Sequence, residues 1–438
     1  MKRVSTLMLA IALCLILCGC NMFVFDTDNI LSPPELSGEL KPIQQALVES
    51  IKGEYTLKYP TYGDIKSAVV TEDLDGDGIK EAFAFYSTSD SEETMMHLNV
   101  IVKDKKKYKS VDDNSKSASG IERIDFYDLN GDGKKEIIVG WEIYAESEKQ
   151  LAVYQFEKNA LTQIMSQKYT NYLCIDFDDN GKNEILVQDL DTKESTNKAS
   201  LYSITENGLT QISGCLLDGK VKSAGRFKLS SLSNGQKAVY IDEIKGIGAV
   251  TEVLFMSKGE LKNPLLDVEN TMENVKTIRS ATIPSADVNN DGIIEIPMAS
   301  DMPNADFNSD EKLYYTNWCS FSGDVLTVKQ VSVVNTADGY SINLPKRFIG
   351  NIAASKNVDK RTRTVYLYDN ELQIIGQRVV TFKAYDKTEY EESEIKKSNN
   401  IKVFSKDNTI VVAETFDIGQ ELGLTSEELE NILSFNAF

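Results

Sequence analysis

The chain has 438 residues, of which 41% are hydrophobic and 26% are charged, so a packed globular protein of two or three domains is expected and disorder is not. Its formal net charge of −20 repels phosphate backbones and anionic headgroups, which argues against nucleic acid as a partner. An acidic surface alone names no function, so the argument depends on where the carboxylates recur along the chain.

The first twenty residues have the pattern of a secretory signal. Lys2 and Arg3 precede an apolar run over Val4–Leu17, which is shorter than the roughly 20 residues that a membrane span needs. The segment ends at Leu17-Cys18-Gly19-Cys20, which resembles the bacterial lipobox. The resemblance implies that residues 1–20 are a signal peptide and that Cys20 carries a lipid anchor. We therefore expect an extracytoplasmic protein held at the bacterial membrane.

Residues 21–62 are expected to lead from the anchor into the folded part. Asn21–Pro34 is predicted to be a tether. Apolar residues at helical spacing predict a helix over Ser37–Lys52, with Ser37 as its N-cap. Tyr55–Tyr62 predicts a strand, and we expect it to pair with the last sheet of a closed ring.

One nonapeptide then occurs in four intact copies, each before an apolar run, and together with a decayed fifth copy it recurs roughly every fifty residues. It has Asp at position 1, Asp or Asn at positions 3 and 5, Gly at position 6 and Glu at position 9. A fifth copy, Ser230–Ala238, has no carboxylate at these positions and predicts a unit without metal. The candidate ligands are Asp73, Asp75, Asp77 and Glu81; Asp128, Asn130, Asp132 and Glu136; Asp176, Asp178, Asn180 and Glu184; and Asp287, Asn289, Asp291 and Glu295.

This spacing suits a hard cation. Ca²⁺ takes 6 to 8 oxygen ligands, and a tight turn that aims positions 1, 3 and 5 inward supplies three of them. Glycine at position 6 permits the sharp turn because it has no Cβ. Four carboxylates in the first loop predict that this loop binds most tightly. Acidic turns without a metal remain the alternative, since Asp, Asn and Gly dominate turns in any case.

An EF-hand opens with the same residues, but it needs Glu at position 12 and a helix on each side. Position 12 in the four copies is Ala84, Val139, Val187 and Met298. The segments that follow the loops, such as Glu136–Trp141, are short apolar runs that predict strands buried on both faces. An EF-hand is therefore not expected.

The loops resemble the FG-GAP or VCBS repeat family, whose blades carry a D-x-[DN]-x-[DN]-G-x-x-[DE] loop between the first and second strands. The resemblance covers residues 63–337 and implies a mainly β fold, a β-propeller of about five or more recognisable blades. It also implies up to four structural Ca²⁺ ions on one face. Pro297, which removes a strand donor, predicts that the fifth blade is bent or that this strand lies at an edge.

Residues 338–438 lack the repeat and predict a small α+β C-terminal domain. Thr362–Tyr368 and Leu372–Tyr385 alternate as strands, and Lys402–Ala413 predicts a hairpin. The sequence Thr425–Glu428 has the pattern of a capping box that opens a final helix.

Three cysteines remain outside the signal and the lipobox, Cys174, Cys215 and Cys319, so at most one disulfide can form. A Cys174–Cys215 bridge is left open, and buried thiols are favoured, because isolated cysteines within apolar strands are usually reduced.

Catalytic motifs are scarce. His97 is the only histidine and is predicted to lie at the surface, and no G-x-S-x-G, P-loop or G-x-G-x-x-G occurs. We therefore expect a binding or interaction module for a protein or glycan and not an enzyme. The alternatives are an accessory subunit of an envelope complex and a carboxylate-dependent glycan-active enzyme, which needs only two carboxylates.

Overall fold

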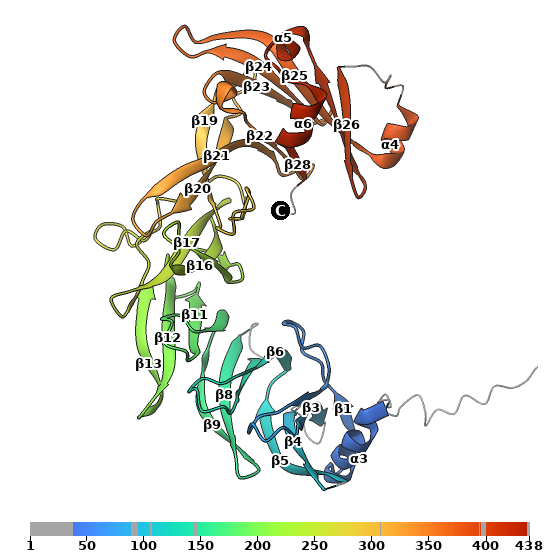
Figure 1. The fold of residues 1–438 in the computed structure, drawn as a ribbon, viewed down its shortest axis with the longest axis vertical. Helices are drawn as coiled ribbons and strands as arrows, with labels where there is room; N and C mark the ends of the chain where they lie inside the picture. Colours follow the sequence, from blue (N-terminus) through green and yellow to red (C-terminus); the bar gives the residue numbers. More distant parts are fainter. Residues whose placement is uncertain are drawn as a thin grey trace, which may run out of the picture. The chain divides into compact units, whose positions relative to one another are not determined.

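A computed structural model describes residues 38–88, 95–105, 107–143, 148–306, 308–393, 395 and 400–435. The expected signal, Cys20, the tether and the Ser37 cap lie outside these residues. The chain divides into two compact units, one of residues 1–124 with 157–161 and one of residues 125–156 with 162–438. Most of the described chain is antiparallel β-sheet (Figure 1).

The first unit opens with a short 3-10 turn, η1 (Gly38–Leu40), and the helix α3 (Lys41–Ser50), which confirms the expected helix. Its buried face packs in one core with the first sheet. In that sheet the strand order is β1-β3-β4-β5, and β2 also pairs with β3. The strands are β1 (Tyr55–Leu57), β2 (Val69–Glu72), β3 (Glu81–Thr88), β4 (Met95–Asp104) and β5 (Lys107–Ser117).

Strand β1 does not pair with a last sheet, so that expectation is wrong. Tyr55 lies opposite Thr88 and Leu57 lies opposite Tyr86, which makes β1 an antiparallel neighbour of β3. Leu57 is 5% exposed within the same core as the α3 side chains. Helix α3 therefore packs against the first sheet, and β1 is a strand of that sheet.

The next two sheets are four-stranded meanders whose spatial order follows the chain. Strand β7 is buried along nearly its whole length, as its continuous apolar run predicts. Meanders of this kind are the blade unit of β-propellers. Their strands are β6 (Gly120–Tyr127), β7 (Glu136–Glu142), β8 (Lys149–Glu157) and β9 (Ala160–Lys168), then β10 (Asn171–Ile175), β11 (Glu184–Asp191), β12 (Thr196–Thr205) and β13 (Gly208–Leu216).

The fourth and fifth sheets repeat the arrangement with additions. In the fifth, β19 is an edge strand and contains Pro297, so the expected edge position is confirmed. The strands are β14 (Ser223–Ala224), β15 (Lys228–Ser231), β16 (Lys237–Lys245), β17 (Gly248–Ser257) and β18 (Glu260–Lys262), then β19 (Ile296–Met302), β20 (Leu313–Phe321), β21 (Leu326–Asn335), β22 (Tyr340–Asn343) and β28 (Leu433–Phe435). The mainly β expectation and a series of five blade-type sheets are thus confirmed.

The sixth sheet has the order β23-β24-β25-β27-β26, and its last pair is the expected hairpin. Its strands are β23 (Ile352–Asn357), β24 (Thr362–Asp369), β25 (Ile374–Asp386), β26 (Ile401–Lys406) and β27 (Thr409–Thr415). The short helical segments are η2 (Lys346–Phe348), α4 (Lys387–Glu392), α5 (Asp417–Glu421) and α6 (Ser426–Ile432). Thr425 caps α6 by accepting the Glu428 N–H, as its sequence indicates.

The fifth and sixth sheets share one hydrophobic core, which includes Tyr315 and Phe382. The domain boundary expected at residue 337 falls inside the fifth sheet, because β22 pairs with β21 and carries the buried side chains of Tyr340 and Ile342. After the sixth sheet, β28 returns to pair with β22.

Candidate metal sites

Each intact acidic loop joins an incoming strand or bridge to the strand that follows it. Loop 73–81 lies between β2 and β3, loop 128–136 between β6 and β7, and loop 176–184 between β10 and β11. Loop 287–295 is closed by an antiparallel bridge between Ala286 and Glu295 and leads into β19. Strands, not helices, flank these loops, so the exclusion of an EF-hand is confirmed.

The Asp at position 1 organises every intact loop through backbone N–H groups. In the first loop Asp73 Oδ1 accepts the Gly76 N–H at 2.9 Å and Oδ2 accepts the Gly78 N–H at 3.0 Å. The position-6 glycines have φ of +84° to +85°, a left-handed backbone conformation that residues with a Cβ rarely adopt. The equivalent Oδ2 bonds to glycine in the other loops measure 2.8 Å, 3.0 Å and 2.8 Å.

The side chain at position 5 turns back over the loop in the same way each time. Asp77 Oδ1 accepts the Ile79 N–H at 2.7 Å, and the three equivalent bonds are 2.8 Å long. Because each of these bonds spans only two residues, local sequence is enough to form the turn. The second oxygen of each Asp at position 5 is not used by this bond.

The Glu at position 9 lies beneath the loop and not at its rim. Its Oε2 accepts the N–H of position 2, at 2.9 Å from Leu74, Leu129 and Phe177 and at 3.1 Å from Val288. All four glutamates are at most 5% exposed. Burial is the main cause that raises their pKa values, and it raises the pKa of Glu295 to about 7. The Glu side chain, which is longer than that of Asp, therefore places its carboxylate beneath the other acidic groups of the loop.

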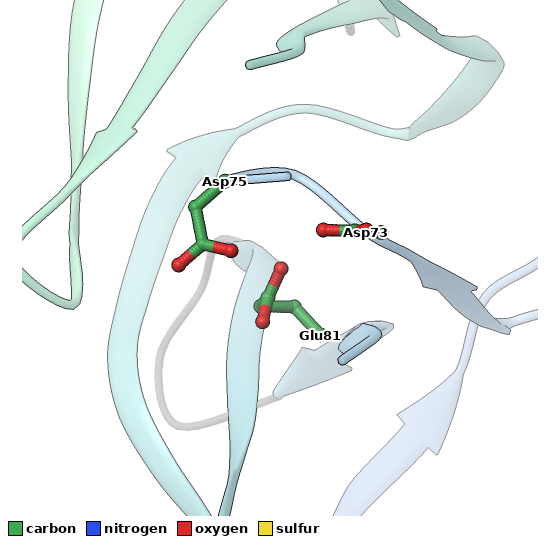
Figure 2. Close-up of side chains that lie close together, drawn as sticks. All are labelled: Asp73, Asp75 and Glu81. Carbon is green, nitrogen blue, oxygen red and sulfur yellow. The ribbon is translucent and has the colours of Figure 1, made fainter. Parts of the chain in front are cut away.

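In two loops three carboxylates converge. Oxygens of Asp73, Asp75 and Glu81 lie within 4.8 Å of one another, and their side chains gather on the inner side of the loop (Figure 2). Asp176, Asp178 and Glu184 form the same group in the third sheet.

Glu184 has a further feature that concerns a ligand. Its residue is 1% exposed, and its Oε1 has no hydrogen-bond partner among the described residues. A buried carboxylate oxygen without a donor is costly unless a cation or a proton reaches it.

The other two loops have an amide at position 3. Asn130 Nδ2 donates to Asp132 Oδ2 at 3.2 Å, and Asn289 Nδ2 donates to Asp291 Oδ2 at 3.0 Å. The amide thus occupies a carboxylate oxygen that a cation would use. These loops offer fewer charges than the first, which is the reason for the prediction that the first loop binds most tightly.

Within the second unit, neighbouring loops are joined directly. Asn183 Nδ2 donates to the Asp128 carbonyl at 3.2 Å, and Lys237 Nζ donates to the Asp176 carbonyl at 2.6 Å. The decayed loop keeps the turn, because Gly235 has φ of +88°. Its Ser230 hydroxyl donates to the Gly292 carbonyl at 3.2 Å. Loops 128–136, 176–184, 230–238 and 287–295 therefore form one connected row.

The only histidine sits in a cross-strand group of the first sheet. Its Nδ1 is 3.0 Å from Asp113 Oδ2 and its Nε2 is 3.1 Å from Thr88 Oγ1. The Tyr86 ring stacks on His97 with centroids 4.5 Å apart, and its hydroxyl donates to Asp113 at 2.8 Å. Only 14% of the His97 side chain is exposed, so it is more enclosed than a solvated surface histidine. We interpret the group as a set of side-chain contacts that stabilises the pairing of β3, β4 and β5.

Sequence reasoning missed a buried acidic group in the fourth sheet. Glu243, Glu252 and Asp218 are all 0% exposed. Glu243 Oε1 accepts the side-chain amides of Gln188 at 2.7 Å and Asn197 at 2.8 Å, while its Oε2 has no partner among the described residues. The signal was present in the sequence, because charged residues interrupt the apolar runs of β16 and β17.

A second set of bonds completes this acidic group. The Asp218 N–H donates to Glu252 Oε1 at 2.9 Å, and the Asn274 amide donates to Glu252 Oε2 at 3.1 Å. Lys245 donates to Asp218 at 2.6 Å and to Glu273 at 2.7 Å. Lys220 also pairs with Glu273, so the two lysines neutralise the edge of the group, and neither pairs with Glu243 or Glu252.

The three cysteines of the described chain, Cys174, Cys215 and Cys319, form no disulfide and remain thiols, as the sequence favours. Burial raises the pKa of Cys215 to about 12 and that of Cys319 to about 11, so both stay protonated at neutral pH. Among the described helices, none has the length and apolar character to cross a membrane.

No known family model matches the chain, and no curated protein matches it. The resemblance to FG-GAP and VCBS repeats therefore rests on the loop residues and their spacing alone.

Among solved structures, the chain is similar to the exotype rhamnogalacturonan lyase YesX at 10% identity, with 82% of this chain and 91% of that chain covered and a TM-score of 0.29. It is also similar to the Pseudomonas aeruginosa periplasmic gluconolactonase PpgL at 10% identity, with 70% and 83% covered and a TM-score of 0.29. The Dos1 propeller is 10% identical, with 82% and 81% covered and a TM-score of 0.28. At such TM-scores the likeness carries no argument, and the blade assignment rests on strand order.

Proposed function

We propose that this chain is a membrane-anchored extracytoplasmic lipoprotein whose propeller-type blades bind Ca²⁺ and act as a binding module for a protein or glycan. The observation that carries the metal proposal is the shared geometry of the four loops, each of which buries a Glu whose Oε2 accepts the N–H of position 2. In two of the loops this Glu also lies within 4.8 Å of the carboxylates at positions 1 and 3. Oxygen-only ligand sets of this kind suit Ca²⁺ better than transition metals, which prefer nitrogen and sulfur.

Electrostatics supports a cation in the first and third loops. Three carboxylates within 4.8 Å repel one another, and burial of Glu81 and Glu184 strengthens that repulsion. The unpartnered Oε1 of Glu184 is an additional oxygen that a cation would satisfy. The role of such ions is structural, since each fixes one turn between two strands of a blade.

The test is the thermal stability of the full chain, purified in detergent, in Ca²⁺ and in EGTA. A ligand that binds only the folded state adds about 2.7 kcal/mol at one hundred times its Kd, so Tm should rise in Ca²⁺. Replacing two ligands together, Asp75→Ala with Asp77→Ala, should reduce that rise. Asn234→Ala, at position 5 of the decayed loop, is the matched control and should leave it unchanged. A Ca²⁺-dependent rise in Tm that is equal in the double variant and the wild type would refute the site assignment.

The lipid anchor has its own test because Cys20 lies outside the described residues. In intact cells the wild type should incorporate labelled palmitate and fractionate with membranes until detergent is added. Cys20→Ser should lose both properties, while Cys319→Ser, a buried thiol in β20, should keep them. Membrane retention of Cys20→Ser without detergent would contradict the anchor.

Two alternatives to a free binding module remain as proposals. An accessory subunit should co-purify from membranes with a stable partner in fixed proportion. A carboxylate-dependent glycan-active enzyme should release reducing ends or unsaturated products from polysaccharides. Hydrolysis or lysis that survives in EGTA and in the Asp75→Ala, Asp77→Ala variant would favour the enzyme and count against a purely structural role for the acidic loops.

A further inference from the structure

A cleft of about 370 Å³ lies in the second unit beside the fourth acidic loop. The segment Pro284–Asn290 forms one side, and side chains of β20, β21, β22 and β28 form the other. The volume lies within the range of small-molecule sites, which is roughly 300–1,000 Å³. The loop that would hold a cation is thus also a wall of this cleft.

A chain of hydrogen bonds fixes the polar side chains on the sheet side. Trp318 Nε1 donates to Ser332 Oγ at 3.1 Å, and the Ser332 hydroxyl donates to Asn343 Oδ1 at 2.8 Å. Gln330 Nε2 donates to the same Asn343 oxygen at 2.7 Å, and Asn343 Nδ2 lies 3.4 Å from Ser434 Oγ. Each amide therefore has one defined orientation, and groups held in place lose little entropy on binding.

The cleft lining excludes several ligand classes. No lysine, arginine or histidine is among its described lining residues, so an anion would find no countercharge. Asp287 is the one carboxylate, and its two oxygens accept the Asp291 and Gly292 N–H groups of the loop. A hydrocarbon ligand would leave amide and hydroxyl groups unpaired in a dry site, which is costly.

A neutral ligand rich in hydroxyl groups fits this lining. The bonds above do not use the carbonyl oxygen of Gln330 or the second N–H of Asn343, which offer one acceptor and one donor. A sugar hydroxyl can donate to the first and accept from the second. Phe435 adds aromatic surface for the C–H face of a sugar ring, whereas Trp318 is 1% exposed and serves only to hold Ser332.

We propose that this cleft binds a neutral carbohydrate, and that Ca²⁺ in loop 287–295 supports binding by fixing one wall. The inference deepens the proposed binding role and rests on it. It names a neutral glycan as the ligand and the fifth sheet as the binding surface.

The test uses the full chain in a polyoxyethylene detergent, because sugar-headed detergents would compete. Binding is measured on an array of neutral oligosaccharides beside uronate-containing and sulfated ones, and then by calorimetry on the best neutral glycan. Gln330→Met removes the amide, including the oxygen that would accept from a sugar hydroxyl, with little change of length, and Ser434→Val removes the hydroxyl that holds Asn343. Gln211→Met, the same change in a different cleft on the third sheet, is the matched control.

We expect neutral glycans to bind at least tenfold more tightly than acidic ones. Gln330→Met and Ser434→Val should each lower affinity at least tenfold while the chain stays folded, and Gln211→Met should stay within twofold of the wild type. The inference would be overturned if no neutral glycan binds or if the variants bind as tightly as the wild type. It would also be overturned if peptides from a library bind in this cleft and glycans do not. Calcium uptake without glycan binding defeats this inference alone. Glycan binding that depends on Gln330 but not on Ca²⁺ defeats the metal proposal and keeps the carbohydrate site.

Discussion

Glu243 and Glu252 form a buried acid pair whose ionisation opposes folding. Burial raises the pKa of Glu252 from 4.5 to about 7, and burial and the neighbouring Glu252 raise that of Glu243 in the same direction. Because the folded-state pKa is the higher one, the favourable contribution is complete below pH 4.5 and is lost as pH rises through 7. A shift from 4.5 to about 7, at roughly 1.36 kcal/mol per pH unit, amounts to about 3 kcal/mol for Glu252.

The substitution Glu243→Gln should raise the free energy of unfolding at alkaline pH, because glutamine carries no charge that burial disfavours. The Gln side chain keeps an oxygen to accept the Gln188 and Asn197 amides and removes one of the two like charges. At pH 8 we expect the variant to be more stable than the wild type. At pH 5 the difference should nearly vanish, since a protonated glutamate resembles glutamine.

Urea unfolding followed by tryptophan fluorescence measures this difference. Trp141 and Trp318 are the only tryptophans and both belong to the second unit, as do Glu243 and Glu252. Glu260→Gln, an exposed glutamate of the same sheet, is the control and should change little at either pH. If Glu243→Gln lowers the free energy of unfolding equally at pH 5 and pH 8, this prediction is refuted. Such a result would show that ionisation of the glutamate pair does not destabilise the folded protein.

The remaining predictions concern the loops. Asn130→Asp should raise the Ca²⁺ affinity measured by calorimetry, because it adds a carboxylate and removes the amide from Asp132; unchanged affinity would contradict the order based on charge. Gly78→Ala should lower the free energy of unfolding by about 1–2 kcal/mol in EGTA through its φ of +85°, with no clash, and a neutral effect would count against the turn geometry. Lys237→Met should increase hydrogen exchange of amides in loop 176–184, whereas protection equal to the wild type would show that the row of loops is not coupled.

The acidic turns could be predicted from the sequence because their bonds are local. Asp73 reaches N–H groups three and five residues ahead, and Asp77 reaches the N–H two residues ahead. Such contacts depend on residue type and spacing, so the repeated pattern, with Asp at position 1, Asp or Asn at positions 3 and 5 and Gly at position 6, was sufficient. The strands after the loops followed in the same way, since an apolar run bounded by turns predicts a strand buried on both faces.

By itself the sequence determined the blade repeat, the acidic turns, the thiols and the mainly β class, because each depends on neighbours along the chain. Only the tertiary structure decided that β1 pairs with β3, that β28 returns to β22 and that Glu243 accepts the side-chain amides of Gln188 and Asn197. It also decided the row of linked loops and the cleft beside loop 287–295. These features join residues far apart in the chain, and their partners are selected by packing and burial, which no local pattern specifies.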